Sequence, residues 1–434
     1  MAGRIRRLPP ARPAFALPLF GLATFTFFCV TARWPELFSE LGIYIALLGL
    51  LLRPTDLSFP TPVRWAAVFL LWALLTIPFS ISPETASAAL IERLKALVIF
   101  FVVVNCVRTP QQLRFYILLT LVAFLIYPAR GTLVGYVTGS NTVFGRAIWN
   151  RIYANPNDLG AITLLMLGWT LAIAVVKKQN LWVRRAAAVC VPLLVTIMLL
   201  TQSRGVFIGL IVGFGPALLT RVKKRPSIAG PVLMVLGIVA VLVPASSWQR
   251  LGGIAKLTST PSTASSTTAS EADPKRAAAR ARDEGSAAQR LEIAKVAWHI
   301  FTNNPLLGVG IGCYREANGR FAPELGERDA HNTYLNLAAE TGIPGLVLWL
   351  GLITSVLAQL RRRRHSLEGD DSQIGVLWME RALIGFLVAA VFATYSGITI
   401  FYLFLGTVWA AASMLGRAAI DSAASVARRP IRAH

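Results

Sequence analysis

Long apolar segments constrain the fold of this chain more than any other feature. A helix needs about 20 mostly apolar residues to cross the hydrocarbon core of a bilayer, and hydrophobic residues make up 55% of the 434 positions. The candidate segments are 14–31, 36–52, 63–79, 90–107, 113–129, 158–176, 185–201, 205–220, 228–246, 343–360, 375–396 and 398–416. We therefore expect an all-α integral membrane protein with about 12 transmembrane helices.

One long polar stretch divides these segments unequally. It predicts spans 1–9 over residues 1–246, a large outer loop with helices over 247–342, and spans 10–12 with a tail over 343–434. Within the loop, the Ser/Thr/Ala-rich residues 258–289 are typical of disorder or a loose solvated helix. The apolar spacing over 290–303 instead predicts an amphipathic helix. The two halves of the chain show no internal repeat, which disfavours a typical secondary transporter.

The formal charge of +22 is mostly a topology signal. With a cytoplasmic N-terminus and alternating spans, 24 of the 43 Lys and Arg residues fall in cytoplasmic segments and seven in the short outer connections. Cytoplasmic loops of membrane proteins carry this excess. The distribution predicts two cytoplasmic termini and an outer 247–342 loop, and it explains the basic charge without a nucleic-acid partner. The first segment lacks a convincing cleavage site, so we expect it to remain as an anchor.

His331 is the first candidate for chemistry. It lies in D-A-H-N-T-Y-L-N-L-A-A-E-T-G-I-P-G at 329–345, where the outer loop returns to the membrane. The ordinary pKa of histidine is near 6.5, so His331 is suited to act as a general base on an acceptor hydroxyl. The alternative is a polar residue at a helix N-terminus with no special role. Asn332 and Tyr334 are expected to support the site.

Arg204 is the second candidate, and it lies in the very short outer turn T-Q-S-R-G between two spans. A charge in such a turn is costly unless it meets water or an anion. The guanidinium group can bind phosphate oxygens in a bidentate manner, which suits a diphosphate. The alternative is an arginine that reaches the lipid headgroups. Gln202 and Ser203 beside it could add hydrogen bonds.

Further outer arginines could share this anion site. Arg290 begins the amphipathic loop helix, and together with Arg204 it could neutralise both charges of a diphosphate. Taken alone, Arg290 is equally well explained as a solvated charge. Arg146 and Arg151 are lower-ranked candidates for the same site.

Motifs for a bound metal ion or nucleotide are missing from the sequence. It contains no D-x-D, H-E-x-x-H or Cys/His cluster, so neither Mg²⁺ nor Zn²⁺ is indicated and we expect no cofactor. G-V-G-I-G at 308–312 follows no predicted strand and lacks a Walker lysine. We interpret it as a tight turn that lets the loop approach the membrane helices.

With these residues in view, the chain resembles the O-antigen ligase family, which also includes polysaccharide polymerases. The resemblance depends on short motifs in matching order, which cover spans 6–10 and the loop. They are A-N-P-N-D-L-G, T-Q-S-R-G, R-L-E-I-A-K-V-A-W, N-P-L-L-G-V-G-I-G-C-Y and H-N-T-Y-L-N-L-A-A-E-T-G-I-P-G.

The resemblance implies an inverting glycosyltransferase of the membrane-embedded C type in the inner membrane of a Gram-negative bacterium. It would transfer a glycan from undecaprenyl diphosphate to an acceptor on the periplasmic face, without metal or nucleotide. The family's loop histidine falls on His331, its arginine after the seventh span on Arg204, and the arginine heading the loop helix on Arg290.

The motifs concern the donor and leave the acceptor open. The leading prediction is a ligase that joins O-antigen to lipid A–core. The nearest alternative is an O-antigen or exopolysaccharide polymerase, which uses the same donor, and a protein O-glycosylation ligase is a further variant. A transporter or flippase is the alternative from another class, and it predicts polar residues deep in several spans.

Overall fold

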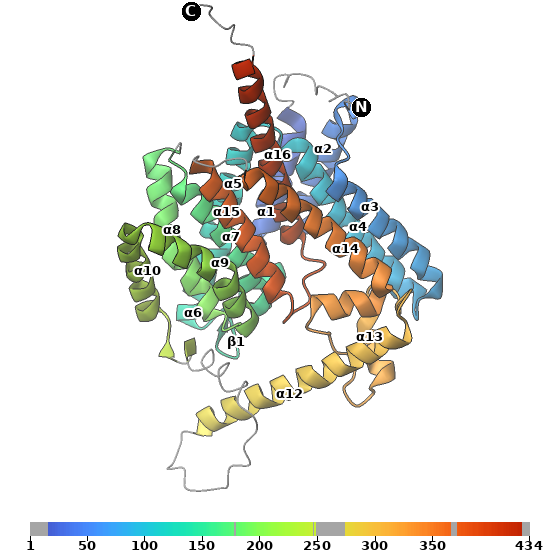
Figure 1. The fold of residues 1–434 in the computed structure, drawn as a ribbon. Coiled ribbons are helices and arrows are strands. Elements are labelled where there is room, and N and C mark those ends of the chain that lie inside the picture. The colour runs from blue at the N-terminus through green and yellow to red at the C-terminus, as the bar shows by residue number, and fades with distance from the viewer. Residues whose placement is uncertain (1–15, 178, 246, 249–273, 366–370, 428–434) are drawn as a thin grey trace, which may run out of the picture.

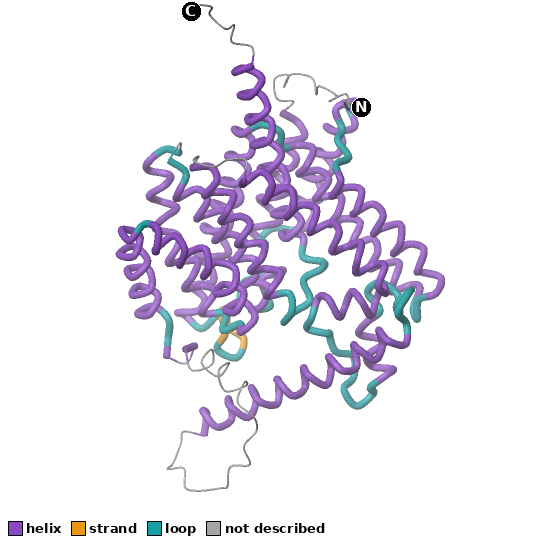
Figure 2. The backbone as a smooth tube through the Cα atoms, in the orientation of Figure 1, coloured by secondary structure: helices purple, strands orange, loops and turns teal. Residues whose placement is uncertain are grey.

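The computed structural model describes residues 16–427 apart from 178, 246, 249–273 and 366–370. Within this part the protein is mostly helical, with one small antiparallel hairpin (Figures 1 and 2). The α-helices are α1 (Ala16–Thr31), α2 (Glu36–Leu51), α3 (Thr61–Thr76), α4 (Pro83–Cys106), α5 (Pro110–Phe124), α6 (Arg130–Thr138), α7 (Pro156–Val175), α8 (Leu181–Leu200), α9 (Arg204–Lys224), α10 (Ala229–Leu242), α12 (Pro274–Asn303), α13 (Tyr314–Phe321), α14 (Thr333–His365), α15 (Asp371–Ala389) and α16 (Thr399–Ala427). The hairpin strands are β1 (Thr142–Val143) and β2 (Arg146–Ala147).

The expected all-α membrane architecture is confirmed in its coarse form. Six helices in the described residues are long and apolar enough to cross a bilayer, and three further apolar helices are shorter. The long ones are Thr61–Phe79, Pro110–Thr138, Pro156–Val175, Leu181–Leu200, Arg204–Lys224 and Thr333–His365. The total of twelve spans stays a prediction. Residues 249–273, which include much of the Ser/Thr/Ala tract, lie outside the described part of the chain.

Small residues bring α9 and α15 into direct backbone contact. A Cβ atom added at Gly209 would lie 2.4 Å from the carbonyl oxygen of Gly385, and one added at Gly385 would lie 2.6 Å from that of Gly209. Gly213 approaches the carbonyl oxygen of Arg381 in the same way. Small residues allow this approach between membrane helices, where van der Waals packing replaces the hydrophobic effect. The contact fixes the start of α9 beside the end of α15.

The connection between α15 and α16 differs from the sequence expectation. The apolar run to residue 396 predicted one helix, but α15 ends at Ala389 and residues 390–398 form an irregular link. Thr333 explains the difference, because its N–H donates to the Ala390 carbonyl (2.9 Å) and its hydroxyl donates to the Ala393 carbonyl (2.7 Å). Backbone groups of the link whose hydrogen bonds are made with a distant segment do not need a helix to provide those bonds.

The connection after α5 also differs from expectation. The predicted apolar segment ends at residue 129, yet the helix continues through a π-helical turn at Leu125–Ala129 into α6, which ends at Thr138. Pro128 lies inside this turn. Proline removes a backbone donor and obstructs regular α-helical bonding, so a wider local turn preserves the helix.

The G-V-G-I-G segment forms the expected tight turn against α14. Gly308 and Gly310 have φ values of +70° and +105°, which favour glycine. A Cβ atom at Gly308 would lie 2.3 Å from the carbonyl carbon of Glu340, and the Gly310 N–H donates to the Glu340 carbonyl oxygen (2.9 Å). At this contact α14 bends at Gly342 (φ 66°, ψ −173°). The turn therefore joins the loop helices to the bend of a membrane helix.

The connections that carry the sequence motifs gather at one end of the molecule. Figure 1 shows the β-hairpin, the start of α9, α12 and α13 at the end away from the two termini. α12 extends across this end outside the bundle (Figure 1). The candidate residues far apart in sequence thus come to the same end.

Candidate active site

His331 lies immediately before α14 in a constrained segment. Its φ of +48° is uncommon for a residue with a Cβ atom. Asn332 caps α14, because its Oδ1 accepts the N–H groups of Tyr334 (3.0 Å) and Leu335 (3.1 Å). The Tyr334 hydroxyl donates to the Leu387 carbonyl (2.7 Å). Asn332 and Tyr334 therefore hold the backbone on the C-terminal side of His331.

The 390–398 link holds the segment from both sides of His331. The Thr394 hydroxyl donates to Asp329 Oδ1 (2.9 Å), and the Tyr395 N–H donates to the Thr333 hydroxyl (2.9 Å). The two contacts bracket His331 in sequence. Fixed supporting contacts of this kind preorganise a functional side chain.

Tyr395 connects the link to the start of α7. Its buried hydroxyl donates to the Asn157 carbonyl (2.9 Å), while the Asn157 side chain accepts a bond from Arg146 Nη2 (2.8 Å). Arg146 Nε in turn donates to the Thr201 carbonyl (2.8 Å). A continuous hydrogen-bonded chain thus extends from the His331 segment to the turn before Arg204.

The turn before Arg204 is itself tightly held. Gln202 is buried with a φ of +50°, and its Nε2 donates to the Gly145 carbonyl (3.2 Å) and the Ser247 hydroxyl (3.1 Å). Ser203 caps α9 by accepting the Val206 N–H. Gln202 and Ser203 therefore serve to fix the turn and the helix start at Arg204.

Three charged residues and burial set the proton affinity of His331. Burial of the half-exposed imidazole lowers its pKa below the ordinary value, and the positive charges of Arg290 and Arg328 lower that pKa further. The Asp329 carboxylate opposes these effects. A lowered pKa keeps the imidazole neutral at neutral pH, which is the form that accepts a proton.

Positive charges from two elements converge on Tyr395. Burial raises the pKa of its hydroxyl well above the ordinary value, and the charges of Arg146 and Arg290 act in the opposite direction. The hydroxyl therefore stays protonated and can donate to Asn157. The charge of Arg290 on α12 therefore acts on both His331 and Tyr395.

Arg151 lies in a different contact. Its Nη1 pairs with Glu36 Oε1 at the start of α2 (3.0 Å), and both side chains are substantially exposed. Arg146, Arg290 and the Arg204 turn are thus linked to the His331 segment by bonds or by charge, whereas Arg151 is engaged by a carboxylate.

A second buried polar group lies beneath the same link. Arg93 on α4 donates from Nη2 to the Ser396 hydroxyl (2.9 Å), and its charge acts on Glu340, which is 4% exposed. The Gly312 and Tyr314 N–H groups and the Asn336 side chain lie near the Glu340 carboxylate. This group fixes the glycine-rich turn and the link to the membrane helices.

Sequence reasoning missed Tyr395, Arg93 and the role of the 390–398 link. Tyr395 lies inside the predicted apolar segment 375–396, and Arg93 was not singled out as a candidate. A signal for the link exists in Y-S-G at 395–397, since Ser and Gly favour a break in a helix. The hydrogen-bond partners of Tyr395 and Arg93 are far away in the sequence, so no local pattern indicates them.

The arrangement can perform two chemical tasks. A neutral imidazole on a fixed segment can take a proton from a hydroxyl group, and the nearby guanidinium groups can bind a polyanion. Among the described residues, no three His, Cys, Asp or Glu side chains lie close enough together to hold a metal ion.

Comparison with known families gives a match over part of the chain. Residues 188–350 match the family model for O-antigen ligase. The matched region begins in α8, includes Arg204, Arg290 and His331, and ends in α14. No match to a curated protein was found. The match and the long apolar helices indicate a multi-pass membrane protein whose residues 188–350 are similar to the O-antigen ligase family.

Proposed function

Because residues 188–350 belong to the O-antigen ligase family, we propose that this protein is a membrane glycosyltransferase that joins O-antigen to lipid A–core. The donor in this proposal is O-antigen polysaccharide on undecaprenyl diphosphate. The reaction takes place on the periplasmic face of the inner membrane, with both termini in the cytoplasm. Neither a metal ion nor a nucleotide takes part.

One observation carries the proposal. The His331 segment and the turn before Arg204 are joined through Thr333, Tyr395, Asn157 and Arg146. A candidate base and candidate anion ligands thus belong to one rigid frame at one end of the helices. Direct transfer from a diphosphate-linked donor needs both functions at one place.

The proposed reaction is a single displacement. His331 takes the proton of an acceptor hydroxyl, and the acceptor oxygen forms a bond to the anomeric carbon of the donor sugar. The bond between that carbon and the diphosphate oxygen breaks on the opposite face, so the anomeric configuration inverts. The electron pair leaves with undecaprenyl diphosphate, whose negative charge Arg204 and Arg290 stabilise, with Arg146 and Arg151 as further candidates.

A purified-protein assay tests the proposal. The protein is mixed with lipid A–core and undecaprenyl-diphosphate-linked glycan without nucleotide or metal, and a larger lipopolysaccharide is the expected product. His331→Ala should abolish most transfer, whereas His299→Ala on the exposed face of α12 is the matched control. Transfer by His331→Ala at the wild-type rate would contradict the general-base role.

The polymerase alternative uses the same donor and differs in the acceptor. In a deletion strain, lipid A–core that carries no O-antigen supports the ligase. Lipid A–core that carries a single repeat unit supports the polymerase instead.

A further inference from the structure

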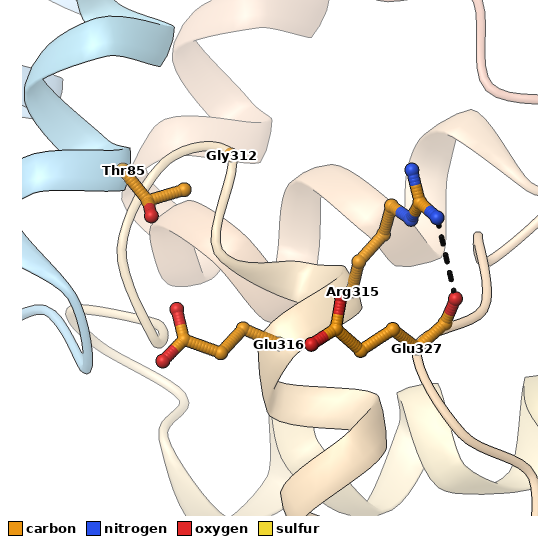
Figure 3. A pocket seen from close by; sticks show the side chains of 5 residues that line it. All are labelled: Thr85, Gly312, Arg315, Glu316 and Glu327. Atoms are coloured by element: carbon orange, nitrogen blue, oxygen red, sulfur yellow. Dashed lines mark hydrogen bonds between the residues drawn. The ribbon is translucent and has the colours of Figure 1, made fainter.

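A polar pocket lies between the start of α4 and α13. It has a volume of about 440 Å³ and is lined by Thr85, Gly312, Arg315, Glu316 and Glu327 (Figure 3). Small-molecule sites have volumes of about 300–1,000 Å³. The pocket is therefore large enough for a small ligand or one part of a longer one.

The lining residues favour a ligand rich in hydroxyl groups. Glu316 and Glu327 provide carboxylate acceptors, Arg315 provides a fork of N–H donors, and Thr85 has a hydroxyl that does both. A sugar ring presents several hydroxyl groups, each of which donates and accepts hydrogen bonds. A lipid tail would find no comparable apolar surface among these residues.

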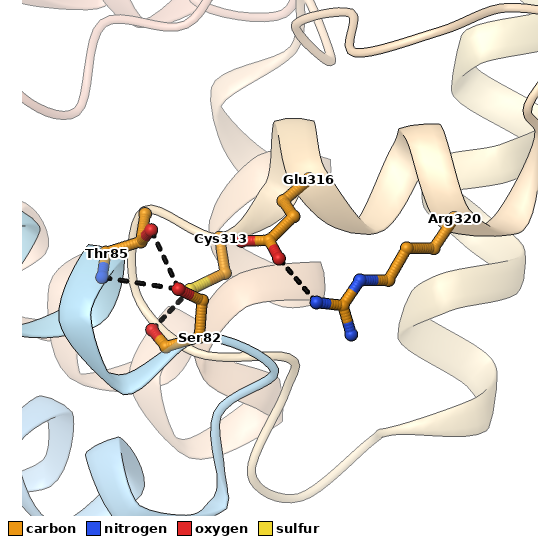
Figure 4. A network of polar contacts seen from close by, with 5 residues as sticks. All are labelled: Ser82, Thr85, Cys313, Glu316 and Arg320. Carbon is orange, nitrogen blue, oxygen red and sulfur yellow. Dashed lines mark hydrogen bonds and ion pairs between the residues drawn. The ribbon is translucent and has the colours of Figure 1, made fainter.

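Contacts around the pocket hold its walls in place. Arg315 Nη2 donates to the Glu327 carbonyl (3.4 Å; Figure 3), and Glu316 is paired with Arg320 (Figure 4). The buried Cys313 thiol donates to the Ser82 carbonyl (3.5 Å), which ties the turn before α13 to the start of α4 (Figure 4). Walls fixed before binding reduce the entropy lost when a ligand is bound.

The pocket is close to His331 along the chain. His331 follows Glu327 by four positions, and a fully extended chain spans at most about 3.6 Å per residue, or about 14 Å here. A short oligosaccharide can bridge this distance, with one sugar in the pocket and a hydroxyl of another at His331.

The pocket lies on the other side of this end from two of the proposed anion ligands, Arg204 and Arg146. Figure 1 shows α13 on one side of this end of the molecule, and α9 and the β-hairpin, which carry Arg204 and Arg146, on the other. A diphosphate held by those arginines would approach His331 from the α9 side. The α13 side is then left for the other substrate.

We propose that this pocket binds a sugar unit of the acceptor glycan and so positions the attacking hydroxyl at His331. The inference deepens the proposed function and rests on it. Glu327 and Arg315 are the residues expected to contact the acceptor sugar.

Steady-state kinetics with each substrate varied separately provide the test. Glu327→Gln and Arg315→Gln should each raise the KM for the lipid A–core acceptor about tenfold, since a hydrogen bond to a charged group is worth roughly that factor. The KM for the donor and kcat should stay near wild type. Glu324→Gln, an exposed change in the same loop outside the pocket lining, is the control.

Direct binding separates failure of this inference from failure of the proposed function. Delipidated core oligosaccharide is titrated into the full-length protein in detergent, and Glu327→Gln should weaken its binding by a similar factor. Weaker binding by Glu327→Gln supports the pocket even if the preparation transfers no glycan. A lack of transfer would count against the proposed function and not against the pocket. An unchanged acceptor KM and unchanged oligosaccharide binding overturn the inference, as does a rise in donor KM alone.

Discussion

Because Gly397 has no side chain, the end of the Arg93 side chain has room to reach the 390–398 link. A Cβ atom added at Gly397 would lie 2.5 Å from Arg93 Nη1, closer than real Cβ contacts come. The end of the arginine side chain can move away, but it would then lose the bond from Nη2 to the Ser396 hydroxyl (2.9 Å). We predict that Gly397→Ala destabilises the protein through the loss of this bond.

The size of the effect follows from the bond that is lost. A hydrogen bond to a charged group contributes about 1.5–3 kcal/mol, and steric adjustment around the new methyl group adds to this cost. The free energy of unfolding should therefore fall by about 2–3 kcal/mol. SDS-induced unfolding of the purified protein in mixed micelles, followed by tryptophan fluorescence, measures this change.

A double-mutant cycle identifies the mechanism. In an Arg93→Met background the bond is already absent, so Gly397→Ala should cost much less there than in the wild type. Lys95→Met, on the exposed face of the same helix, is the control background and should leave the full cost in place. Equal costs of Gly397→Ala in the Arg93→Met and wild-type backgrounds would refute the reasoning.

Three further predictions concern the site and the opposite end of the bundle. Arg328→Gln removes a charge that lowers the pKa of His331, so that pKa should rise and the acidic limb of the pH–rate profile should move to higher pH. Tyr395→Phe removes the bond to Asn157, which should cost about 1 kcal/mol in unfolding and slow transfer without raising the donor KM. Glu380→Ala removes a 1%-exposed carboxylate paired with two arginines, and SDS titration should show a loss of about 3 kcal/mol. An unmoved acidic limb for Arg328→Gln would contradict the first prediction, and a wild-type transfer rate for Tyr395→Phe the second. An unchanged unfolding curve for Glu380→Ala would contradict the third.

Local signals in the sequence identified much of the framework. The end of α12 at Asn303, the helix start after Asn332 and the break at Gly342 follow from apolar spacing, capping residues and glycine. Each depends on interactions within a few residues, so the sequence alone suffices to predict it. The apolar segments that became the long helices are equally local in origin.

Long-range contacts determine the features of the fold and site that could not be predicted from the sequence. The hydrogen bond from Tyr395 to Asn157 joins residues 238 positions apart, and that from Arg93 to Ser396 joins residues 303 apart. Nothing in the local pattern of residues 375–396 indicates that Thr333 will bind their backbone and end α15 at Ala389.

The sequence by itself determined that this chain forms membrane helices, and it singled out His331, Arg204 and Arg290 as residues worth testing. The tertiary structure decided which of the candidates share one frame, namely Arg146 and the Arg204 turn with the His331 segment, and which is held elsewhere, namely Arg151 by Glu36. The physical reason is that apolar spacing and helix caps act locally, whereas a site depends on hydrogen bonds between segments that only folding brings together.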